Sequence, residues 1–542
     1  MKKSKLLCLA LAAASIVTIA SGCKEKKTST NAENVTLTGV NEFPVVKEKV
    51  EFSVFVPKSS FVSDFETNEF TKWYEEKTNV HINWSVSSGD AQQAFNLMIA
   101  SGEYPDIILG MGLSREQVSS LAKQGIVVDI SKEIDKYGYY TKRMFEKEPT
   151  AKEYVMFGDK IYGIPRVSAT YASRYKLAMW VYRPWMEKLG IEEPQTTEEF
   201  YQMLKAFKEK DPNGNGKADE IPLAARGVYN WGTGIEAFLM SAFIPDDASG
   251  RYYVDNGQVK YAGVQPEYRD GLRYIKKLYD EGLIYRDTFI LDRNQITALG
   301  ENETPILGAA PGEYPGMFCN PTGTTKRYHE FTTIPPLKGP GGVRATVPTS
   351  SVANGHSFIV TKTCKHPDVA VKWVDWLMSE EGKIKSQDRG LTITRKAKDG
   401  ELGVDGRQAL WTIEQKSAEE QAKYSEGMQN LAWYNSGIYY SSLESSLRTC
   451  DPENKSAELY KLYSTYDKYG TDKYKQITIA DEDIDAYTDY QSIKDETEAS
   501  FAKFVTGEYD LDKDWDKYVA GLNNLGLKEY MKLLQRNYDA VK

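Results

Sequence analysis

The stretch VHINWSVSSGDAQQAFNLMIASGEYPDIIL, residues 80–109, indicates the fold class of the chain. It opens with a strand pattern over 80–86, continues with an amphipathic helix over 90–101, and ends on a short apolar run, 107–109, that is typical of a buried strand. A strand, a helix and a second strand in this order predict a βαβ unit. We therefore expect an α/β protein with a mainly parallel sheet covered by helices.

The same alternation continues on both sides of this stretch. Upstream, residues 51–57 predict a strand and 69–78 a helix, and downstream 114–123 predict another helix. The alternation stops at DKIYGIP, residues 159–165, and resumes with a strand over 177–182. This interruption predicts a crossover between two parts of the molecule.

The rest of the chain changes gradually from mixed to helical. Thr196 and Glu199 form a capping box that starts a helix, residues 221–225 predict a strand, and Asn256-Gly257 predicts a hairpin. From residue 412 onward the pattern is helical, with no strand expected. With 542 residues, the chain is long enough for about three domains or two large lobes.

The oxygen-rich loop, DPNGNGKADEIP at residues 211–222, has the spacing of a calcium site. Oxygens at the first, third and fifth positions, Gly216 at the sixth and a carboxylate at the ninth match the front of an EF-hand loop, but Pro222 replaces its twelfth-position Glu. A surface turn rich in Asn, Gly and Asp is the alternative. The predicted ligands are the side chains of Asp211, Asn213, Asn215, Asp219 and Glu220 and the carbonyl of Lys217.

The N-terminus has the features of an export signal. Positive charges precede an apolar run, Leu6 to Ala20, and Ser21-Gly22 lies directly before Cys23. This end resembles the lipobox of bacterial lipoproteins, which implies cleavage of residues 1–22 and diacylglyceryl modification of Cys23; an ordinary secretory signal is the alternative. Residues 23–47 predict a flexible tether.

Composition narrows the classes of function. The chain has 36 Tyr, 10 Trp and 19 Phe, and rings with polar edges suit the apolar faces of sugars. A net charge of −9 without a dense basic run makes nucleic acid an improbable partner. Cys319, Cys364 and Cys450 are an odd number without CxxC spacing, so neither a zinc site nor a full disulfide framework is predicted.

Six pieces in order resemble the extracellular solute-binding proteins of carbohydrate ABC importers, family 1 type, and in particular their large LplA-like lipoproteins. They are the lipobox with its tether, SGEYPDI (101–107), IYGIP (161–165), the oxygen-rich loop, HPDVAVKWVDWLMSEEG (366–382) and the ending TGEYDLDKDWDKYVAGLNNLGLKEYMKLLQRNYD (506–539). The resemblance covers nearly all of residues 50–542.

The resemblance implies a periplasmic-binding-protein-like fold of type II. It has two α/β lobes, a multi-strand hinge, a helical C-terminal extension and a structural Ca²⁺ in the oxygen-rich loop. We expect lobe 1 to hold residues 48–165 and 300–355, and lobe 2 to hold 166–299 and 356–542.

The predicted function is capture of a sugar, in particular an oligosaccharide, by a monomer on the extracellular face of the cytoplasmic membrane. The protein would deliver this sugar to an ABC permease without catalysis. We expect rings and polar side chains to line the ligand cleft. The candidates are Tyr162, Trp231, Glu313, Tyr314, Arg389, Trp433 and Tyr434. A cell-surface glycoside hydrolase, which needs only two suitably spaced carboxylates, and a lipoprotein adhesin or assembly factor are the rival hypotheses.

Overall fold

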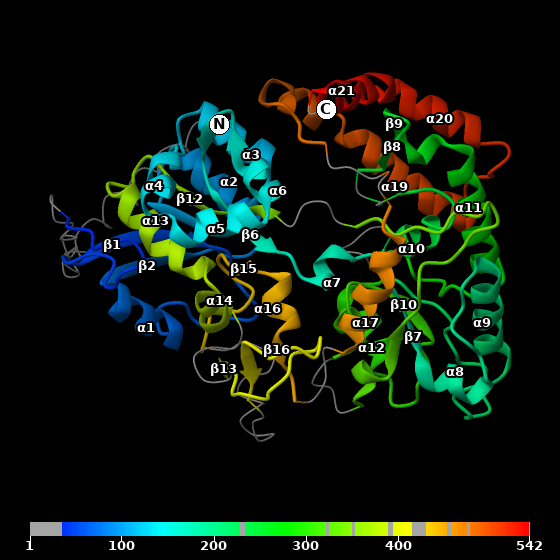
Figure 1. Ribbon diagram of the computed structural model, residues 1–542. Coiled ribbons are helices and arrows are strands. Elements are labelled where there is room, and N and C mark those ends of the chain that lie inside the picture. Colours follow the sequence, from blue (N-terminus) through cyan, green and yellow to red (C-terminus); the bar gives the residue numbers. More distant parts are fainter. Residues whose placement is uncertain are drawn as a thin grey trace, which may run out of the picture.

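The computed structural model describes residues 35–540 except 228–232, 247, 249, 321–324, 349–352, 388–393, 415–429, 453–456, 472 and 474–476. The signal sequence, Cys23 and the first part of the tether therefore lie outside the described residues. The described chain forms two units that lie side by side, at the left and right of Figure 1.

The first unit is built on a six-stranded mixed sheet in the order β15-β6-β12-β3-β1-β2. β1, β2 and β3 run parallel, while β12 is antiparallel to both β3 and β6. The βαβ unit predicted over 80–109 is confirmed, with β1 inserted between its two strands. The strands are β1 (Val50–Val56), β2 (Val80–Val86), β3 (Ile107–Leu113), β6 (Ile164–Ser168), β12 (Ala353–Val360) and β15 (Tyr440–Ser441).

Helices surround this sheet, and their starts follow the sequence signals. The side chains of Asn68 and Asp90 accept backbone amide hydrogen bonds at the first turns of α1 and α2. Asp375 of α13 accepts from the amides of Tyr140 and Thr141, which fixes α13 against α5. The helices are α1 (Glu69–Thr78), α2 (Ala91–Ser101), α3 (Arg115–Lys123), α4 (Ser131–Tyr137), α5 (Tyr139–Lys147), α6 (Pro149–Val155), α13 (Pro367–Asp375) and α14 (Glu380–Gln387).

The second unit contains a three-stranded antiparallel sheet, β10-β7-β11, formed by β7 (Met179–Tyr182), β10 (Ala309–Pro311) and β11 (Phe331–Thr333). The capping box at Thr196 and the hairpin at Asn256-Gly257 are confirmed. Around the sheet lie α8 (Arg183–Leu189), α9 (Thr197–Glu209), α10 (Ile235–Met240), α11 (Pro266–Asp280), α12 (Arg293–Gly300) and the hairpin of β8 (Tyr252–Asp255) and β9 (Gln258–Tyr261).

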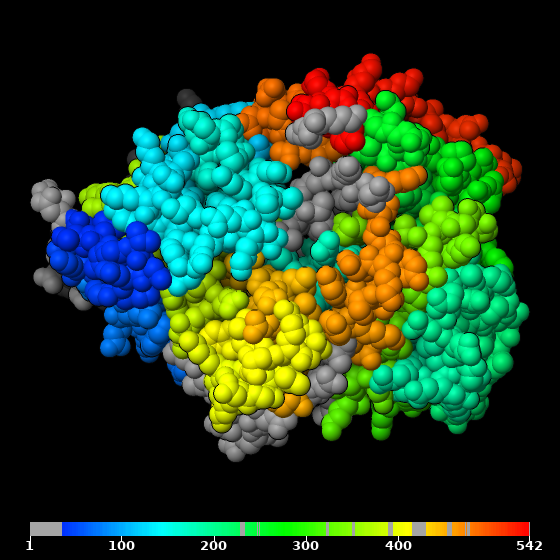
Figure 2. Space-filling model, in the orientation of Figure 1, coloured from blue at the N-terminus to red at the C-terminus, as the bar shows by residue number. Residues whose placement is uncertain are grey.

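The chain passes between the units through α7 (Tyr171–Arg174), again between β11 and β12, and again before α17 (Ala457–Tyr466). α17, orange in Figure 2, lies against the second unit. One apolar core is confined to the first unit. A larger core extends from the second unit to the side chains of Phe55, Ile108 and Ile359 on the first sheet. The two units are therefore in direct apolar contact.

The C-terminal helices cover the second unit at the top right of Figure 1. α19 packs on α11 and α21 packs on β9, while α18 reaches across to α3 of the first unit. Among the described residues, none of the helices combines the length and the hydropathy that crossing a membrane requires. The helices are α18 (Ile484–Asp489), α19 (Gln491–Thr506), α20 (Trp515–Asn524) and α21 (Leu527–Asp539).

The predicted allocation of the later segments to the lobes is wrong. β10 and β11, within 300–355, pair with β7 of the second unit and not with the first sheet. β12 and β15, predicted to lie mainly in lobe 2, belong to the sheet of the first unit. Pairing between strands that are far apart in sequence decides this allocation, and local pattern does not encode it.

Three local predictions are also wrong. Residues 35–47 are folded and not a free tether, because Val45 and Val46 are buried and Lys372 Nζ donates to the Val45 carbonyl at 3.1 Å. Residues 221–225 make only isolated bridges, since Pro222 lacks an amide hydrogen. The region after 412 is not purely helical.

The part of the chain from residue 394 onward contains strands too short to show a period in sequence. β15 joins the first sheet, and a small separate sheet is formed by β13 (Thr394–Lys396), β14 (Trp411–Ile413) and β16 (Thr449–Cys450). A two-stranded hairpin, β4 (Met156–Phe157) and β5 (Lys160–Ile161), precedes β6, and α16 (Leu443–Leu447) follows β15. Cys319, Cys364 and Cys450 are free thiols.

Candidate functional site

A cavity of about 510 Å³ lies where the two units meet, and we call it the basic cavity. The first unit contributes side chains from β6, β12, α14 and β15, and the second contributes the start of α12 and the turn after β10. α7, which connects the units, closes one side. A ligand held here would touch both units, and the volume lies in the usual range for small-molecule sites.

The charged residues of this cavity are mostly positive. Its lining contains one carboxylate, Glu313, among the residues that the structure describes. The five cationic side chains are Arg166, Lys176, Arg226, Arg293 and Lys383. The chain as a whole is acidic, so this local excess of positive charge runs against the composition.

Burial shapes the electrostatics around Glu313. Loss of hydration raises the pKa of the Glu313 carboxyl, while the neighbouring Lys176 and a hydrogen bond from Ser173 Oγ at 3.2 Å oppose that rise. Loss of hydration also lowers the pKa of Lys176, and Arg166 adds to that lowering. Opposite charges are thus held close together in a partly dehydrated space.

Two arginines at the second unit's side of the cavity repel each other. Burial and the charge of Arg293 both lower the pKa of Arg226, and Asp292 offsets part of this effect. The Nε atoms of Arg226 and of Arg166 are buried and have no hydrogen-bond partner among the described residues. Arg293 is more exposed and donates to the Gly316 carbonyl at 3.0 Å.

Three tyrosines supply rings to the cavity, namely Tyr314, Tyr434 and Tyr439. The ring of Tyr434 packs edge-on against Phe61 at 5.2 Å between centroids, which fixes its direction. The Arg166 guanidinium lies 5.7 Å from the centroid of the Tyr439 ring. Rings beside hydrogen-bond donors are the combination that a sugar ring needs.

The structure brings together three of the seven predicted ligand residues: Glu313, Tyr314 and Tyr434 all line the basic cavity. Trp433 does not. It is 1% exposed, lies in the core of the first unit and donates through Nε1 to Thr71 Oγ1 at 2.7 Å. Its assignment to the cleft is therefore wrong, because both its ring and its polar edge are used inside the fold.

Of the remaining predicted residues, Tyr162 lies beside Phe157 at 5.8 Å between centroids and does not line the basic cavity. Trp231 and Arg389 lie outside the described residues. Contact of any of these side chains with a ligand stays a prediction.

The cationic residues of the cavity are absent from the sequence-based candidates. Arg166 and Arg226 carried a signal, because each is a charged side chain next to a buried apolar run, Ile164-Pro165 and Leu223-Ala224-Ala225. Charged residues in such positions are expensive to bury and are frequently functional. Lys176 carried the same signal, because it directly precedes the buried run Leu177-Ala178-Met179, whereas Lys383 carried none.

The oxygen-rich loop connects α9 to the bridge at Ile221 and is folded tightly on its own backbone. Asp211 Oδ1 accepts from the amides of Gly214 and Asn215 at 2.9 and 3.1 Å, and Oδ2 accepts from Gly216 at 3.0 Å. Gly214 and Gly216 have φ angles of +76° and +71°, a conformation that favours glycine. These contacts direct the side chains of the loop inward.

Two further carboxylates complete this loop. Asp219 accepts from the side-chain amides of Asn213 and Asn215 at 2.9 and 3.0 Å, and these hydrogen bonds lower its pKa. Burial and the nearby charges of Asp211 and Asp219 raise the pKa of Glu220. Its Oε1 atom is buried without a hydrogen-bond partner among the described residues.

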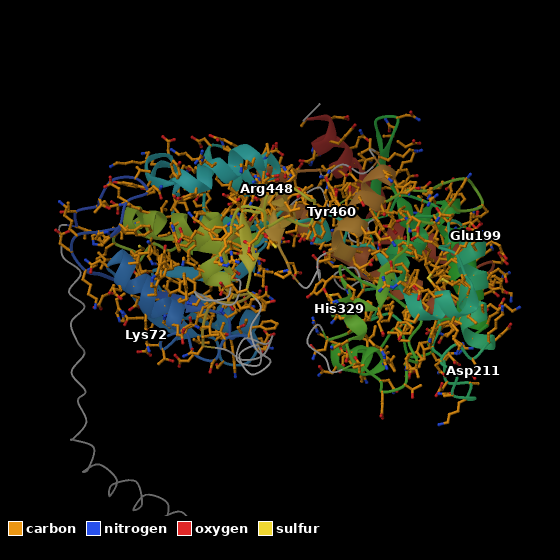
Figure 3. The ribbon with its side chains drawn as sticks, turned by 60° about the horizontal axis from the view of Figure 1, so that its bottom comes forward. Lys72, Glu199, Asp211, His329, Arg448 and Tyr460 are labelled. Carbon is orange, nitrogen blue, oxygen red and sulfur yellow. The ribbon has the colours of Figure 1, made fainter. Side chains whose placement is uncertain are left out.

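This set of donors fits a hard cation. No three described His, Cys, Asp or Glu side chains converge closely enough to form a metal site by themselves. The loop would instead combine carboxylates with amide and carbonyl oxygens, as calcium sites do. No residue of the loop lines the basic cavity, and Figure 3 shows Asp211 at the outer end of the second unit, so a cation there would not contact a ligand in that cavity.

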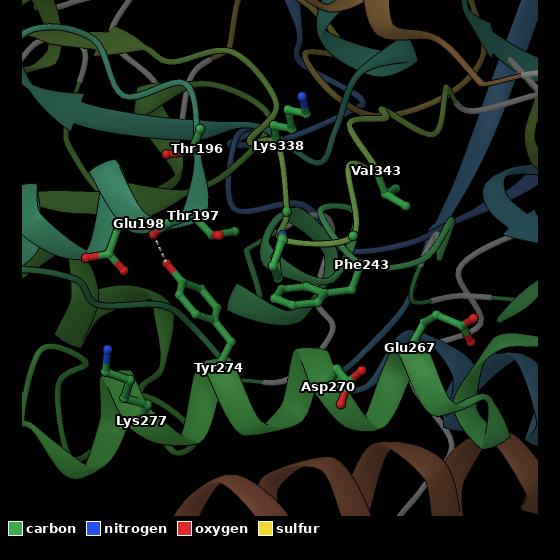
Figure 4. Close-up of a pocket in the computed structure, with 13 residues that line it drawn as sticks. Thr196, Thr197, Glu198, Phe243, Glu267, Asp270, Tyr274, Lys277, Lys338 and Val343 are labelled. Atoms are coloured by element: carbon green, nitrogen blue, oxygen red, sulfur yellow. Dashed lines mark hydrogen bonds between the residues drawn. The ribbon is translucent and has the colours of Figure 1, made fainter.

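A second cavity of about 860 Å³ lies within the second unit, between the start of α9, α11 and the loop at 338–343 (Figure 4). Its charges are mixed, and Tyr274 Oη donates to the Thr197 carbonyl at 2.7 Å across its wall. Because all of its lining comes from one unit, movement of the units would not change its contents. The charged residues are Glu198, Glu267, Asp270, Lys277 and Lys338.

Comparison with known protein families shows which family the chain belongs to. The family model for bacterial extracellular solute-binding proteins matches residues 58–384, and the chain belongs to that family. The family assignment and the two-lobed α/β fold predicted from the sequence are thereby confirmed.

Particular relatives extend the likeness over the whole chain. The chain is 27% identical over 561 residues to the fructooligosaccharide ABC transporter substrate-binding protein FusA of Streptococcus pneumoniae, covering 98% of this chain and 97% of FusA. It is 26% identical over 410 residues to the lipoprotein LipO of Bacillus subtilis, covering 73% and 74% of the two chains. A solved structure of an EF-hand mutant of S. pneumoniae FusA with fructo-nystose superposes with a TM-score of 0.74 at 23% identity, covering 91% of this chain and 99% of the other.

Proposed function

We propose that the protein captures an oligosaccharide in the basic cavity and delivers it to an ABC-type permease. The observation that carries this proposal is a single cavity lined by tyrosines and hydrogen-bonding side chains from both units. The relative FusA, named for fructooligosaccharide and for an ABC transporter, supports both the class of ligand and the partner.

Binding would act by shifting a conformational population. A ligand that contacts both units only when they are close together stabilises the closed state by its extra affinity for that state. The residues that the two units contribute, such as Glu313 from one and Tyr434 from the other, would form contacts at the same time. The permease would then recognise the closed, loaded form. No step in this cycle requires catalysis.

We further propose that the oxygen-rich loop binds a structural Ca²⁺. Two observations support this site: Glu220 Oε1 has no described hydrogen-bond partner, and backbone amides already hold the carboxylate of Asp211 in place. The solved structure of an EF-hand mutant of FusA indicates that a relative has a loop of this class. The proposed ligands are the six residues named from the sequence. The cation would fix the end of α9 relative to the bridge at Ile221.

We also propose a lipid anchor at Cys23 on the extracellular face of the membrane. The family is extracellular, and the relative LipO is named as a lipoprotein. Two acyl chains hold a protein stably at a membrane, whereas one chain does not.

A thermal-shift screen of the mature chain, residues 24–542, against mono- and oligosaccharides tests the central proposal. We expect a rise in melting temperature with at least one oligosaccharide, stoichiometric binding by calorimetry and no new reducing ends. A fall in the radius of gyration on binding, measured by X-ray scattering, would support closure. If no saccharide binds, or if the sugar is cleaved, the proposed function is wrong.

A further inference from the structure

The charge of the basic cavity is unusual within this molecule. Among the described residues, five cationic side chains and one carboxylate line it, whereas three carboxylates and two lysines line the larger cavity of Figure 4. Both cavities belong to a chain with 77 acidic and 68 basic residues. The positive excess is therefore a property of the basic cavity and not of the surface in general.

The cations form two groups within this cavity. On the second unit, burial and the charge of Arg293 lower the pKa of Arg226. Where the chain crosses between the units, burial and the charge of Arg166 lower the pKa of Lys176. Keeping like charges close together in a partly dehydrated space costs free energy. A neutral hydroxyl group would accept a hydrogen bond there but would not offset the repulsion, whereas a carboxylate would do both.

The unused hydrogen-bond donors of the cavity also favour a ligand with carboxylates. The buried Nε atoms of Arg166 and Arg226 have no partner among the described residues, although each is a donor in a fixed planar group. Arginine binds carboxylates with two parallel hydrogen bonds, which satisfies such donors. The two groups of cations belong to different segments of the protein. This arrangement suits a ligand with several carboxylates along its length better than it suits a single compact anion.

We infer that the solute is an acidic oligosaccharide whose uronate carboxylates bind Arg166, Arg226, Arg293, Lys176 and Lys383 in the basic cavity. This inference rests on the proposed function, because it names the class of sugar for the same site. The tyrosines of the cavity would pack against the sugar rings between the carboxylates.

The test compares matched pairs of ligands on the full mature chain by calorimetry. Trisaccharides of galacturonate, mannuronate and glucuronate are each measured beside the neutral trisaccharide obtained by reducing their carboxyl groups. We expect the acidic member of at least one pair to bind about tenfold or more tightly than its neutral partner. Raising the NaCl concentration should weaken binding of the acidic member only.

Two substitutions localise the effect. Arg293→Gln and Lys383→Gln should each weaken binding of the acidic trisaccharide by about tenfold and leave any neutral ligand within about twofold. Arg293 is exposed, so its replacement should leave the melting temperature unchanged. The matched control is Lys385→Gln, because Lys385 lies on the same helix, pairs with Glu381 at 3.9 Å and does not line the cavity.

The possible outcomes separate the inference from the proposed function. If neutral oligosaccharides bind and no acidic member is preferred, the inference is overturned while the proposed function stands. If none of these sugars and no other saccharide binds, both fail. Equal loss of affinity in Lys385→Gln and Lys383→Gln would also overturn the inference. Acidic sugars would then be bound by positive charge in general and not by the lining of the basic cavity.

Discussion

The two units meet in two places that handle charge in opposite ways. At the contact between α3 and residues 481–489, the segment that contains α18 and that we call the α3–α18 contact, each cation of α3 faces a carboxylate. Arg115 Nη2 lies 2.6 Å from Asp481 Oδ1, and Lys123 Nζ lies 3.0 Å from Asp485 Oδ2. In the basic cavity, five cations share one described carboxylate, Glu313. Among the described residues, each cation of the first place has its own carboxylate, whereas the lining of the second holds more cations than carboxylates.

This difference separates a holding contact from a binding one. Balanced charges gain their free energy from each other and have little left for a solute. Unbalanced charges are costly in the empty protein and gain free energy only when an anion arrives. Stability should therefore depend on the α3–α18 contact, and affinity should depend on the cavity.

The largest expected effect comes from removing one arginine at each place. Arg115 is mostly buried and also donates to the carbonyl of Tyr154 at 3.0 Å, so Arg115→Met should lower the free energy of unfolding by about 3 kcal/mol. Burial lowers the pKa of both arginines, but the Nε atom of Arg226 has no hydrogen-bond partner among the described residues, so Arg226→Met should leave that free energy unchanged or raise it. Urea unfolding of the unliganded protein measures both.

Binding of an acidic trisaccharide provides the reverse comparison for these two variants. Arg226→Met should weaken binding, whereas Arg115→Met should retain affinity at temperatures where it remains folded. If Arg226→Met destabilises the protein as much as Arg115→Met does, the cavity charge is structural and the distinction between the two places fails.

The parts of the molecule that could be predicted from sequence are those contained in one short segment. The capping box at Thr196 and the oxygen-rich loop depend on neighbours within about a dozen residues, and the βαβ unit lies within the single stretch 80–109. The basic cavity does not, because its lining runs from Arg166 to Ser441 and is assembled only by long-range pairing. The lobe allocation failed for the same reason, since β12 pairs with β3 and β6 across more than a third of the chain.

Two adjacent aromatic residues show the limit most directly. Trp433 and Tyr434 are both aromatic with a polar edge. Trp433 nevertheless lies in the core, with its ring centroid 4.9 Å from that of Phe70, whereas Tyr434 lines the basic cavity. The turn that carries them, with Asn435 at a φ angle of +54°, sends successive side chains to different surroundings. Residue type alone could not separate them.

The second prediction concerns the oxygen-rich loop, which concentrates negative charge as the cavity concentrates positive charge. Calcium at about 100 times its Kd should raise the free energy of unfolding by about 2.7 kcal/mol, and EDTA should remove that gain. Glu220→Gln should abolish the calcium effect, because it removes the charge of the carboxylate whose Oε1 atom has no hydrogen-bond partner among the described residues. Melting curves with calcium and with EDTA measure this.

The control for this prediction is Asp399→Asn, an exposed acidic residue in a turn of the first unit. It should keep the full calcium effect. Sugar affinity should be the same with and without EDTA while the protein is folded, because no residue of the loop lines the basic cavity. A strong dependence of affinity on calcium would show that the loop and the cavity are coupled.

The third prediction tests the carboxylate at the α3–α18 contact. Asp481 is partly exposed, so Asp481→Asn should cost about 1 kcal/mol, less than the loss of Arg115. If this contact holds the units close together, the radius of gyration of the unliganded variant should also rise. Asp485→Asn is the matched control, because its ion pair with Lys123 is much more exposed and should contribute less.

The smallest expected effect concerns the single carboxylate in the cavity. Burial raises the pKa of Glu313, so this group takes up a proton at a higher pH than an ordinary Glu. As pH falls through that raised pKa, the cavity loses its one described negative charge, and affinity for an acidic trisaccharide should rise. The rise in affinity should end at about pH 4, where the carboxylates of the sugar begin to protonate.

Glu313→Gln should reproduce the protonated state at every pH. At pH 7 we expect it to bind the acidic trisaccharide about threefold more tightly than the natural chain and to lose the pH dependence above about pH 5. Glu267→Gln, in the cavity of Figure 4, should change neither property. A fall in affinity in Glu313→Gln would instead mean that the carboxylate itself binds the sugar, as it would if it accepted from hydroxyl groups, and the balance of charge in the cavity would then serve a neutral solute.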